Sequence, residues 1–310
     1  MPTTIEDLPE EMLVEIFSYL EFEDCLAATT VCRLWSGLAL RWKKLRVDLE
    51  YNVKDKSFRT LLASSRPYRH FSFDCSCPYV DWDEPAQILA KFSSTIEILE
   101  ISTYYSSKEF HEFLAKMTTL CTNLKRLAIE WNESELSGLE ISFQPLNDLS
   151  DLYLSLRAEN LLEIDFRKVT PNITNLCLGI GPNFELSQQI LQHFSPRLEE
   201  LKVWFYDEDL FNIVCEMNFP LLKKLNFLLS ISGQDHDWSL NLFTKFFRRC
   251  ANLEEVTLLI RVNKHLLESL AQFCCNLQSL RFNIMKLPED CFRCLSEMRC
   301  LKVPNDDIFF

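Results

Sequence analysis

The sequence is poor in the residues on which nucleotide-binding and catalytic motifs depend. Its 310 residues include only 5 glycines and 5 histidines, and the glycines form no G-x-G-x-x-G or P-loop pattern. Glycine-rich loops allow backbone N–H groups to approach a phosphate closely, so nucleotide loops of this kind are excluded. A G-x-S-x-G nucleophile elbow is also missing. We therefore expect a protein that is not an enzyme and that needs no cofactor.

Long apolar runs and an excess of basic residues are missing as well. No stretch approaches the roughly 18 to 20 apolar residues that a membrane-spanning helix needs, and the first residues carry acids where a signal peptide has a basic region. The formal net charge of -13 disfavours nucleic acid, because phosphate contacts require clustered Lys and Arg. We expect an intracellular protein, cytoplasmic or nuclear, with neither nucleic acid nor a membrane as its partner.

Cysteine is abundant, but its use is expected to be structural. A chain with 13 cysteines and no secretory signal is best explained by reduced thiols that pack as small apolar residues. Two sets of residues have spacings that a metal ion could use: Cys291, Cys294 and Cys300, and Asp235, His236 and Asp237. Packing in the last part of the chain explains the first set more simply, and a solvated loop explains the second. We expect no metal site.

Residues 5–47 combine short helical patterns with a large amount of apolar surface. Apolar residues recur there at steps of three and four, which places them on one broad helical stripe: Leu8, Met12, Leu13, Ile16, Phe17 and Leu20. Pro9 suits an early helical position, and Asp24 or Glu23 suits the start of a second helix. Three short helices of this size cannot bury all of that surface, so the stretch is expected to dock on another protein.

The same stretch resembles a known module. The run L-P-x-E-M-L-x-E-I-F-S-Y-L, then E-F-E-D, then V-C-R-L-W, is similar to the F-box, by which F-box proteins hold the Skp-type adaptor of cullin–RING ubiquitin ligases. The resemblance implies these adaptor-binding positions: Leu8, Pro9, Ile16, Phe17, Leu20, Val31, Cys32 and Trp35. Cys25 stands where the family usually has Leu, which implies a weaker pocket contact there.

The rest of the chain is a repeat. A unit of apolar, two variable, apolar, one variable and apolar residues recurs eleven times, with first residues 21 to 31 positions apart. The second and third apolar residues of the copies are Leu45/Val47, Phe71/Phe73, Leu99/Ile101, Leu127/Ile129, Leu152/Leu154, Leu176/Leu178, Leu201/Val203, Leu225/Phe227, Val256/Leu258, Leu280/Phe282 and Leu301/Val303. Spacings of about 20 to 29 are typical of leucine-rich repeats.

The repeat predicts the fold. Each unit supplies a strand, and helical patterns lie between the strands at Glu109–Leu120, Glu185–Phe194, Glu208–Met217, Leu240–Arg249 and His265–Cys274. The prediction is an α/β fold in which a three-helix F-box (1–45) precedes a leucine-rich-repeat solenoid (46–310) with about eleven degenerate repeats. Parallel strands should line its concave face, with helices on the convex face. This arrangement resembles that of F-box/LRR proteins.

Further structural expectations follow from this pattern. Cys121, Cys250 and Cys274 are expected to be small core residues that close helices. The third helix approaches the first strand near Trp42, so the F-box should cap the N-terminal end of the solenoid. The long interval between two copies, with residues 233–238, predicts a loop at one rim, either a plain insertion or a functional one.

The variable strand residues should point away from the core onto the concave face, because side chains alternate along a strand. Acids gather there in the first repeats, and basic and apolar residues in the later ones. The candidate target-binding residues are Glu100, Tyr153, Lys202, Trp204, Leu228 and Arg281. For Trp204, packing under a neighbouring loop is the alternative.

The combined pattern predicts a substrate-recognition subunit of a ubiquitin ligase. Its F-box would bind the Skp-type adaptor, and through it a cullin, while the solenoid binds a target protein that the sequence does not identify. A recognition or scaffold protein that binds the adaptor without supporting ubiquitin transfer is the alternative.

Overall fold

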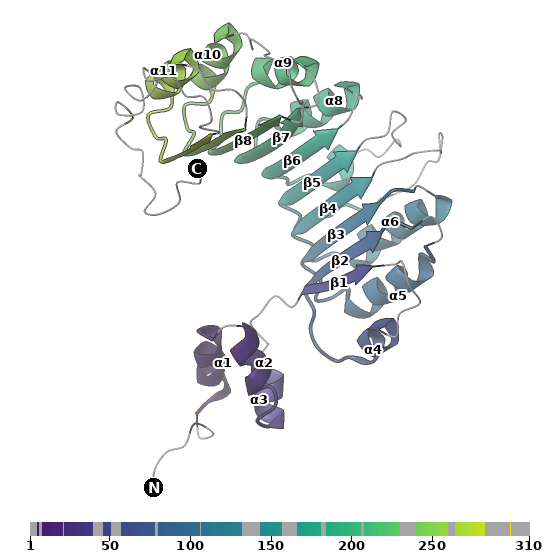
Figure 1. Ribbon diagram of the computed structural model, residues 1–310. Helices are drawn as coiled ribbons and strands as arrows, with labels where there is room; N and C mark the ends of the chain where they lie inside the picture. The colour runs from purple at the N-terminus through teal and green to yellow at the C-terminus, as the bar shows by residue number, and fades with distance from the viewer. Residues whose placement is uncertain are drawn as a thin grey trace.

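The protein consists of a small helical unit followed by a curved α/β solenoid (Figure 1). The computed structural model describes residues 5, 8–20, 22–39, 46–50, 57–77, 80–105, 107–131, 143–156, 166–180, 184–205, 208–229, 240–259, 264–282 and 298. In the solenoid the strands form the inner layer of an arc, and the helices lie along its outer side (Figure 1). The predicted division into concave strands and convex helices is confirmed.

The helical unit, residues 5–39, contains the three predicted helices. They are α1 (Glu10–Ser18), α2 (Phe22–Ala28) and α3 (Arg33–Leu38). Glu10 and Glu11 lie in the first turn of α1, where the positive end of the helix dipole favours carboxylates. At the start of α3, the backbone N–H of Trp35 donates to Cys32 Sγ at 3.5 Å. A small core of the unit's own holds the helices together: Leu13, Phe17, Ala28, Leu38 and Ala39.

The solenoid is built on one parallel sheet whose ten described strands follow each other in sequence order. They are β1 (Arg46–Glu50), β2 (His70–Cys75), β3 (Ile98–Thr103), β4 (Arg126–Trp131), β5 (Asp151–Leu156), β6 (Asn175–Ile180), β7 (Glu200–Phe205), β8 (Lys224–Leu229), β9 (Glu255–Leu259) and β10 (Ser279–Phe282). Ten of the eleven predicted copies therefore coincide with strands. Of the eleventh, Met298 is buried, and Leu301 and Val303 lie outside the described residues.

Helices connect most of the strands. They are α4 (Ser57–Ala63), α5 (Asp83–Phe92), α6 (Lys108–Leu120), α7 (Phe166–Val169), α8 (Phe184–Phe194), α9 (Glu208–Glu216), α10 (Leu240–Arg249) and α11 (Lys264–Phe273). The five predicted helical segments are all present, with ends within one residue of those expected. Helices α4, α5 and α7 were not among the helical segments predicted from the sequence, and α4 and α7 are short.

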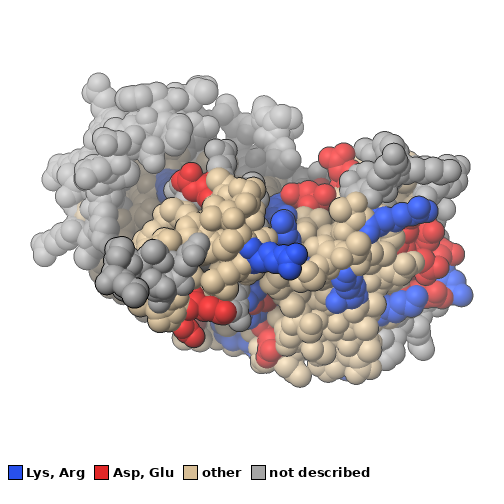
Figure 2. Space-filling view, turned by 90° about the horizontal axis from the view of Figure 1, so that it is seen from below, with Lys and Arg blue, Asp and Glu red and all other residues tan. Residues whose placement is uncertain are grey.

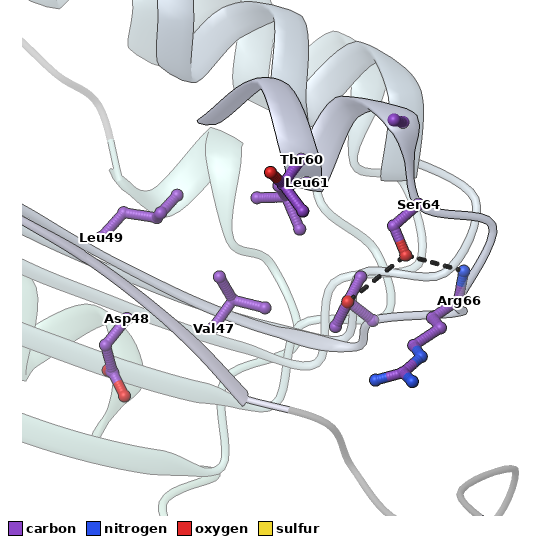
Figure 3. A pocket seen from close by; sticks show the side chains of 9 residues that line it. Val47, Asp48, Leu49, Thr60, Leu61, Ser64 and Arg66 are labelled. Atoms are coloured by element: carbon purple, nitrogen blue, oxygen red, sulfur yellow. Dashed lines mark hydrogen bonds between the residues drawn. The ribbon is translucent and has the colours of Figure 1, made fainter. Parts of the chain in front are cut away.

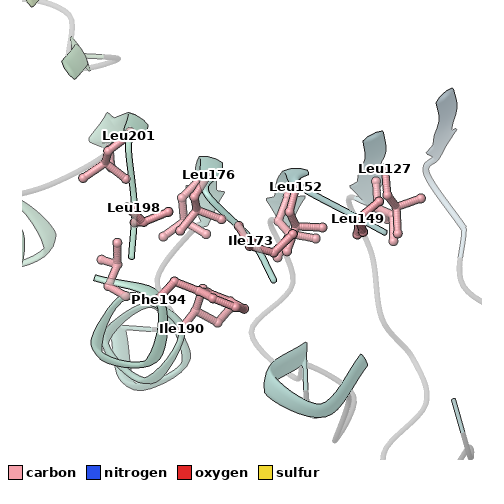
Figure 4. Close-up of a cluster of buried hydrophobic side chains, with 14 of the residues drawn as sticks. Leu127, Leu149, Leu152, Ile173, Leu176, Ile190, Phe194, Leu198 and Leu201 are labelled. Carbon is pink, nitrogen blue, oxygen red and sulfur yellow. The ribbon is translucent and has the colours of Figure 1, made fainter. Parts of the chain in front are cut away.

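The core lies between the sheet and the outer helices. Along most strands buried residues alternate with partly exposed ones, as in β3 and β7, so the motif leucines all face the helices. Figure 4 shows motif residues of successive strands side by side in a row, with Ile190 and Phe194 of α8 packed against them. A single buried cluster extends from Leu61 to Met298. Stacked repeats thus bury together what one repeat could not bury alone.

The register corrects the expected alignment of the first repeat. Val47 pairs with Phe71 and Leu49 with Phe73, whereas the motif had aligned Leu45 and Val47 with those two residues. The first strand is therefore shifted by two residues along its neighbour. Because a shift of two preserves which residues face the core, the side chains keep their faces but change their neighbours.

Asparagine side chains tie successive repeats together. The Asn123, Asn172 and Asn252 Nδ2 groups donate to backbone oxygens of the preceding repeat, at Ser94 (3.0 Å), Asn147 (2.8 Å) and Pro220 (2.9 Å). Each asparagine lies directly before the first apolar residue of its motif. These bonds give hydrogen-bond partners to backbone carbonyl groups in the turns of the preceding repeat.

We expect Asn172→Ala to lower the free energy of unfolding by about 0.5–1.5 kcal/mol, the usual net contribution of one hydrogen bond. The measurement is equilibrium urea unfolding of the purified chain. Asn147→Ala is the matched control, since it removes an amide side chain from the same turn but keeps the backbone oxygen that Asn172 contacts. An equal loss in both variants would show that the bond itself contributes nothing.

The three cysteines predicted to close helices do so. Cys121, Cys250 and Cys274 are at most 4% exposed, and their backbone N–H groups donate to the last turns of α6, α10 and α11. Burial raises the pKa of each of these thiols to about 12. They are therefore protonated packing residues without thiolate reactivity at neutral pH.

His111 is a titratable group inside the core. Its ring is fully buried in α6, with ring centroids 5.7 Å from Phe110 and 5.3 Å from Trp131. Burial lowers the pKa of His111 below its ordinary value of 6.5, because charging the ring in an apolar site is unfavourable. The folded protein thus holds a proton at this site less readily than the unfolded chain does.

Acidification should therefore destabilise the protein through His111. The contribution of His111 is complete above pH 6.5 and is lost below it, at up to about 1.4 kcal/mol per pH unit until the folded-state pKa is reached. Urea unfolding at pH 7.5 and 5.5 should show a smaller acid-induced loss for His111→Phe than for the unmodified chain. An identical pH dependence in both proteins would contradict this assignment.

Three sequence predictions lie wholly or partly outside the described residues. These are the loop at 233–238, the cysteines at 291, 294 and 300, and the junction at Trp42. The cap expected from the N-terminal helices depends on that junction and stays a prediction. The helical unit and the solenoid have separate cores, and the apolar contact described between them joins Cys25 of α2 to Tyr68.

Candidate functional site

Helix α1 has two apolar faces. Leu13 and Phe17 are buried in the unit's own core, with Leu20 partly buried beside them. Met12, Ile16 and Tyr19, at spacings of four and three, lie on another face and are 50%, 38% and 81% exposed. Val31 (60%) and Leu34 (40%) add exposed apolar side chains at the start of α3. We call these five residues the outer apolar face.

The structure divides the predicted adaptor-binding residues into exposed, partly buried and buried ones. Ile16 and Val31 belong to the outer apolar face, and Pro9 is exposed next to it in sequence. The partly buried members are Leu8, Leu20, Cys32 and Trp35. Phe17 differs from the expectation, because it is only 1% exposed and its ring lies 5.1 Å from that of Trp35, edge to face. Phe17 therefore holds the helices together instead of offering surface to a partner.

Sequence reasoning missed Met12, Tyr19 and Leu34 as surface residues. Met12 had been counted in one stripe together with Leu13 and Phe17. The direction in which each side chain leaves the helix axis could have separated them. At 100° per residue, Met12, Ile16 and Tyr19 fall within about 60° of one another. Leu13 and Phe17 point about 100° or more away from Met12.

Cys25 does not occupy a pocket-facing position. Its side chain is fully buried, and Sγ lies 3.6 Å from the Phe17 backbone oxygen and 3.9 Å from that of Leu20. It packs against Leu20 and against Tyr68 of the solenoid. The expectation of a weaker adaptor contact at Cys25 is therefore corrected: a small residue here lets α2 approach the first repeats.

The concave face of the sheet, on the side away from the helices, carries regular columns of side chains. We call it the open face. The first column runs from Asp48 through Ser72, Glu100, Ala128, Tyr153, Cys177, Lys202, Asn226 and Thr257 to Arg281. The second column runs from Glu50 through Asp74, Ser102, Glu130, Ser155 and Gly179, then continues through Trp204 and Leu228 to Leu259. All six predicted target-binding residues lie in these columns.

Glu100 is already engaged within the protein. Its carboxylate lies 3.2 Å from Arg46 Nη2 and 3.4 Å from His70 Nε2, and Arg46 also pairs with Asp48 at 2.7 Å. Desolvation by burial lowers the pKa of His70, which opposes the attraction of Glu100. This ion-pair group links the first three strands and partly neutralises their acids. Glu100 is therefore less available to a target than its sequence position indicated.

The centre of the face carries a built aromatic pair. The rings of Tyr153 on β5 and Trp204 on β7 lie 5.6 Å apart, edge to face, across the intervening strand β6. A side chain at Gly179 would crowd this approach, because a Cβ there would lie 3.2 Å from Trp204 Cε3, closer than most carbon contacts. Lys202 Nζ lies 4.6 Å from the centre of the Trp204 ring, within cation–π range.

These contacts decide between the two expectations for Trp204. The indole packs over Gly179 and against Tyr153 on the sheet itself, and its side chain remains partly exposed. Tyr153, Lys202 and Trp204 together form a platform on the open face, which we call the aromatic platform. Leu228, beside Trp204 on β8, and Leu259 on β9, 52% exposed, extend it toward the C-terminal repeats.

Cys177 is the one cysteine in the two columns of the open face. Cys177, on the open face, has a pKa raised to about 12, chiefly by burial, which opposes thiolate formation at neutral pH. Groups of three or more His, Cys, Asp or Glu that could hold a metal ion do not occur among the described residues. In that same part of the chain, no helix combines the length and apolar character required to cross a bilayer.

A cavity lies at the N-terminal edge of the solenoid, between β1 and α4 (Figure 3). It has a volume of about 740 Å³, and its lining includes Val47, Leu49, Leu61, Ser64 and Tyr68. The Ser64 hydroxyl lies 3.3 Å from that of Tyr68 and accepts the Arg66 N–H at 3.2 Å. Its apolar lining is the exposed end of the solenoid core, where stacking begins.

Charges of both signs are interspersed on the face seen in Figure 2. Blue and red side chains alternate there over a largely uncharged surface. Salt bridges also join successive repeats, including Lys125 with Glu97 at 3.3 Å and Lys224 with Glu255 at 3.0 Å. The described part of this face is thus not a continuous basic track of the kind that follows a nucleic-acid backbone.

Comparison with protein families identifies the N-terminal unit. A family model described as F-box-like matches residues 5–47. The chain contains an F-box-like domain. The chain thus combines an F-box-like domain with a solenoid of ten described parallel strands, the organisation that the resemblance to F-box/LRR proteins implied.

Comparison with solved structures finds the leucine-rich repeat-containing protein LegL7 from Legionella pneumophila. It has 13% sequence identity and a TM-score of 0.42, over 82% of this chain and 97% of that one. The repeat architecture of this chain rests instead on its own ten described parallel strands and their order. A comparison with curated proteins gives no match.

Proposed function

We propose that this protein is the substrate-recognition subunit of a Skp adaptor–cullin–F-box ubiquitin ligase. The observation that carries the proposal is the outer apolar face of the F-box-like domain, with Tyr19 and Val31 81% and 60% exposed. Five large apolar side chains exposed on so small a domain favour a protein partner. The Skp-type adaptor is the partner that the family match supports, and the adaptor would connect the protein to a cullin.

In this function the chain catalyses nothing itself. It brings a target and the ubiquitin-charged enzyme together, so acceleration comes from proximity and orientation. A solenoid suits this task because every interior strand pairs with a neighbour on each side, and one continuous core supports them all. The target would bind on the open face of the sheet. We place the complex in the cytoplasm or the nucleus, where the adaptor and cullin act.

The test is a reconstituted ubiquitination reaction. The full chain is mixed with the adaptor, the cullin–RING core, the ubiquitin-activating and ubiquitin-conjugating enzymes and a protein captured by the solenoid. We expect ubiquitin transfer to that captured protein, lost when Met12 and Ile16 are both replaced by alanine. Adaptor binding with no transfer would overturn the ligase function and favour the alternative, a recognition or scaffold protein. Failure to bind the adaptor would overturn both.

A further inference from the structure

The second column of the open face changes character along the solenoid. Over β1–β4 it is mainly acidic, with Glu50, Asp74 and Glu130. Over β5 and β6 it is small and buried, with Ser155 and Gly179. Over β7–β9 it is apolar, with Trp204, Leu228 and Leu259. Along this column, acidic side chains at one end are thus followed by small side chains in the middle and apolar side chains at the other end.

At the acidic end, some carboxylates form ion pairs within the protein and others do not. Glu100 and Asp48, in the first column, are paired with Arg46. Asp74 accepts hydrogen bonds from Ser76. Neither Asp74 nor Glu130 forms a salt bridge with any described residue. Their charges therefore remain available to basic side chains of a partner.

The apolar end is shaped by contacts inside the protein. The Trp204 ring lies 5.6 Å from that of Tyr153 and packs over Gly179, so a partner would meet an indole that already has contacts within the protein. Leu228 is partly exposed, and Leu259 is 52% exposed. A preformed aromatic side chain next to exposed leucines is typical of the anchor region of an interface.

The strand spacing sets the distance between the acidic and the apolar side chains of this column. Glu130 on β4 and Trp204 on β7 are separated by three strand spacings, about 14 Å. An extended peptide advances about 3.3 Å per residue, so about four residues cover that distance. Such a segment would run across the strands, parallel to the column. It could pass close to the sheet at Ser155 and Gly179, where the side chains are small.

We propose that this column binds an extended protein segment with a Lys or Arg separated by about four residues from a large apolar residue. The basic side chain pairs with Glu130, and Asp74 serves a second one farther along. The apolar side chain lies on Trp204, Leu228 and Leu259. This proposal rests on the proposed function only in taking the open face as the target-binding face, and it specifies the chemistry of the target.

The test begins with selection from a randomised 12-residue peptide library displayed on phage, with the purified full chain as bait. We expect enriched peptides to contain Lys or Arg about four residues from an aromatic or branched apolar residue. Enrichment of acidic peptides, enrichment of peptides without an apolar anchor, or no enrichment over the starting library would overturn the proposal.

Variants then locate the binding of the best selected peptide, measured by fluorescence polarisation. We expect Glu130→Lys and Trp204→Ala each to weaken binding tenfold or more. Gly179→Val should weaken it as well, because the new side chain displaces the indole while leaving it in the sequence. Glu112→Lys is the matched control, since it makes the same charge change at an exposed site on outer helix α6 and should leave the affinity unchanged.

Equal affinities for Glu130→Lys, Trp204→Ala and the unmodified chain would place the peptide elsewhere and refute the proposal. A 20-nucleotide single-stranded DNA that binds in place of the peptide, with the same dependence on these residues, would also refute it. Adaptor co-purification is measured on the same variants and should be unchanged. The peptide specificity and the adaptor function can therefore fail independently of each other.

Discussion

Replacing Met12 and Ile16 together by alanine should weaken adaptor binding at least tenfold and leave the solenoid folded. Both side chains belong to the outer apolar face, being 50% and 38% exposed, and neither is part of the buried core. A fully buried side chain of this size contributes roughly 1.5–3 kcal/mol, and about 1.4 kcal/mol corresponds to a tenfold change in affinity. The measurement is isothermal titration of purified adaptor into the full chain.

Two further variants separate contact from packing. Glu15→Ala changes an exposed polar residue of the same helix and should leave the affinity nearly unchanged. Phe17→Ala removes a buried ring, so we expect it to reduce binding through partial unfolding of the F-box-like domain, visible as lost helical signal by circular dichroism. If the double variant binds the adaptor as well as the unmodified chain, the outer apolar face is not the docking surface.

Truncation of Phe227 to alanine should lower the free energy of unfolding by about 3–5 kcal/mol, the usual cost of deleting a buried phenylalanine. The Phe227 ring is fully buried, with centroids 5.0 Å from Phe205 and 5.6 Å from Phe246. These rings come from β7, β8 and α10, so the cavity would lie where successive repeats join. Equilibrium urea unfolding with tryptophan fluorescence measures the change.

Leu221→Ala is the control for Phe227→Ala. Leu221 precedes the same strand but is 49% exposed, and we expect a change within about 1 kcal/mol. A comparable loss in both variants would show that the aromatic contacts do not couple the repeats. Adaptor binding should be unaffected in either variant under folding conditions, because the F-box-like domain has a core of its own.

The repeat pattern predicted the strands with little error because it is a local signal. In β7, Leu201 and Val203 face the core, and their alternation with Lys202 and Trp204 follows from the backbone geometry of any strand. The same rule placed Tyr153 and Trp204 on the open face. The short helices α4 and α7 were missed because four to seven residues hold too few periods to be recognised.

The site residues were harder to predict where orientation decides the role. Phe17 and Ile16 are neighbours in one apolar stripe, yet one is 1% exposed and the other 38%. That difference depends on how α1 rotates against Trp35 and Ala28, which are distant along the chain. Glu100 was expected to face a target, but Arg46 and His70 reach it from two other strands.

The sequence by itself determined the two-part organisation, the location of the strands and the alternation that sets which side of the sheet each residue occupies. These follow from short-range geometry and from motif spacing. Only the tertiary structure decided the register of β1, the inward rotation of Phe17, and the contact of Trp204 with Tyr153 across Gly179. Each of these depends on contacts between side chains far apart in the chain, which no local pattern encodes.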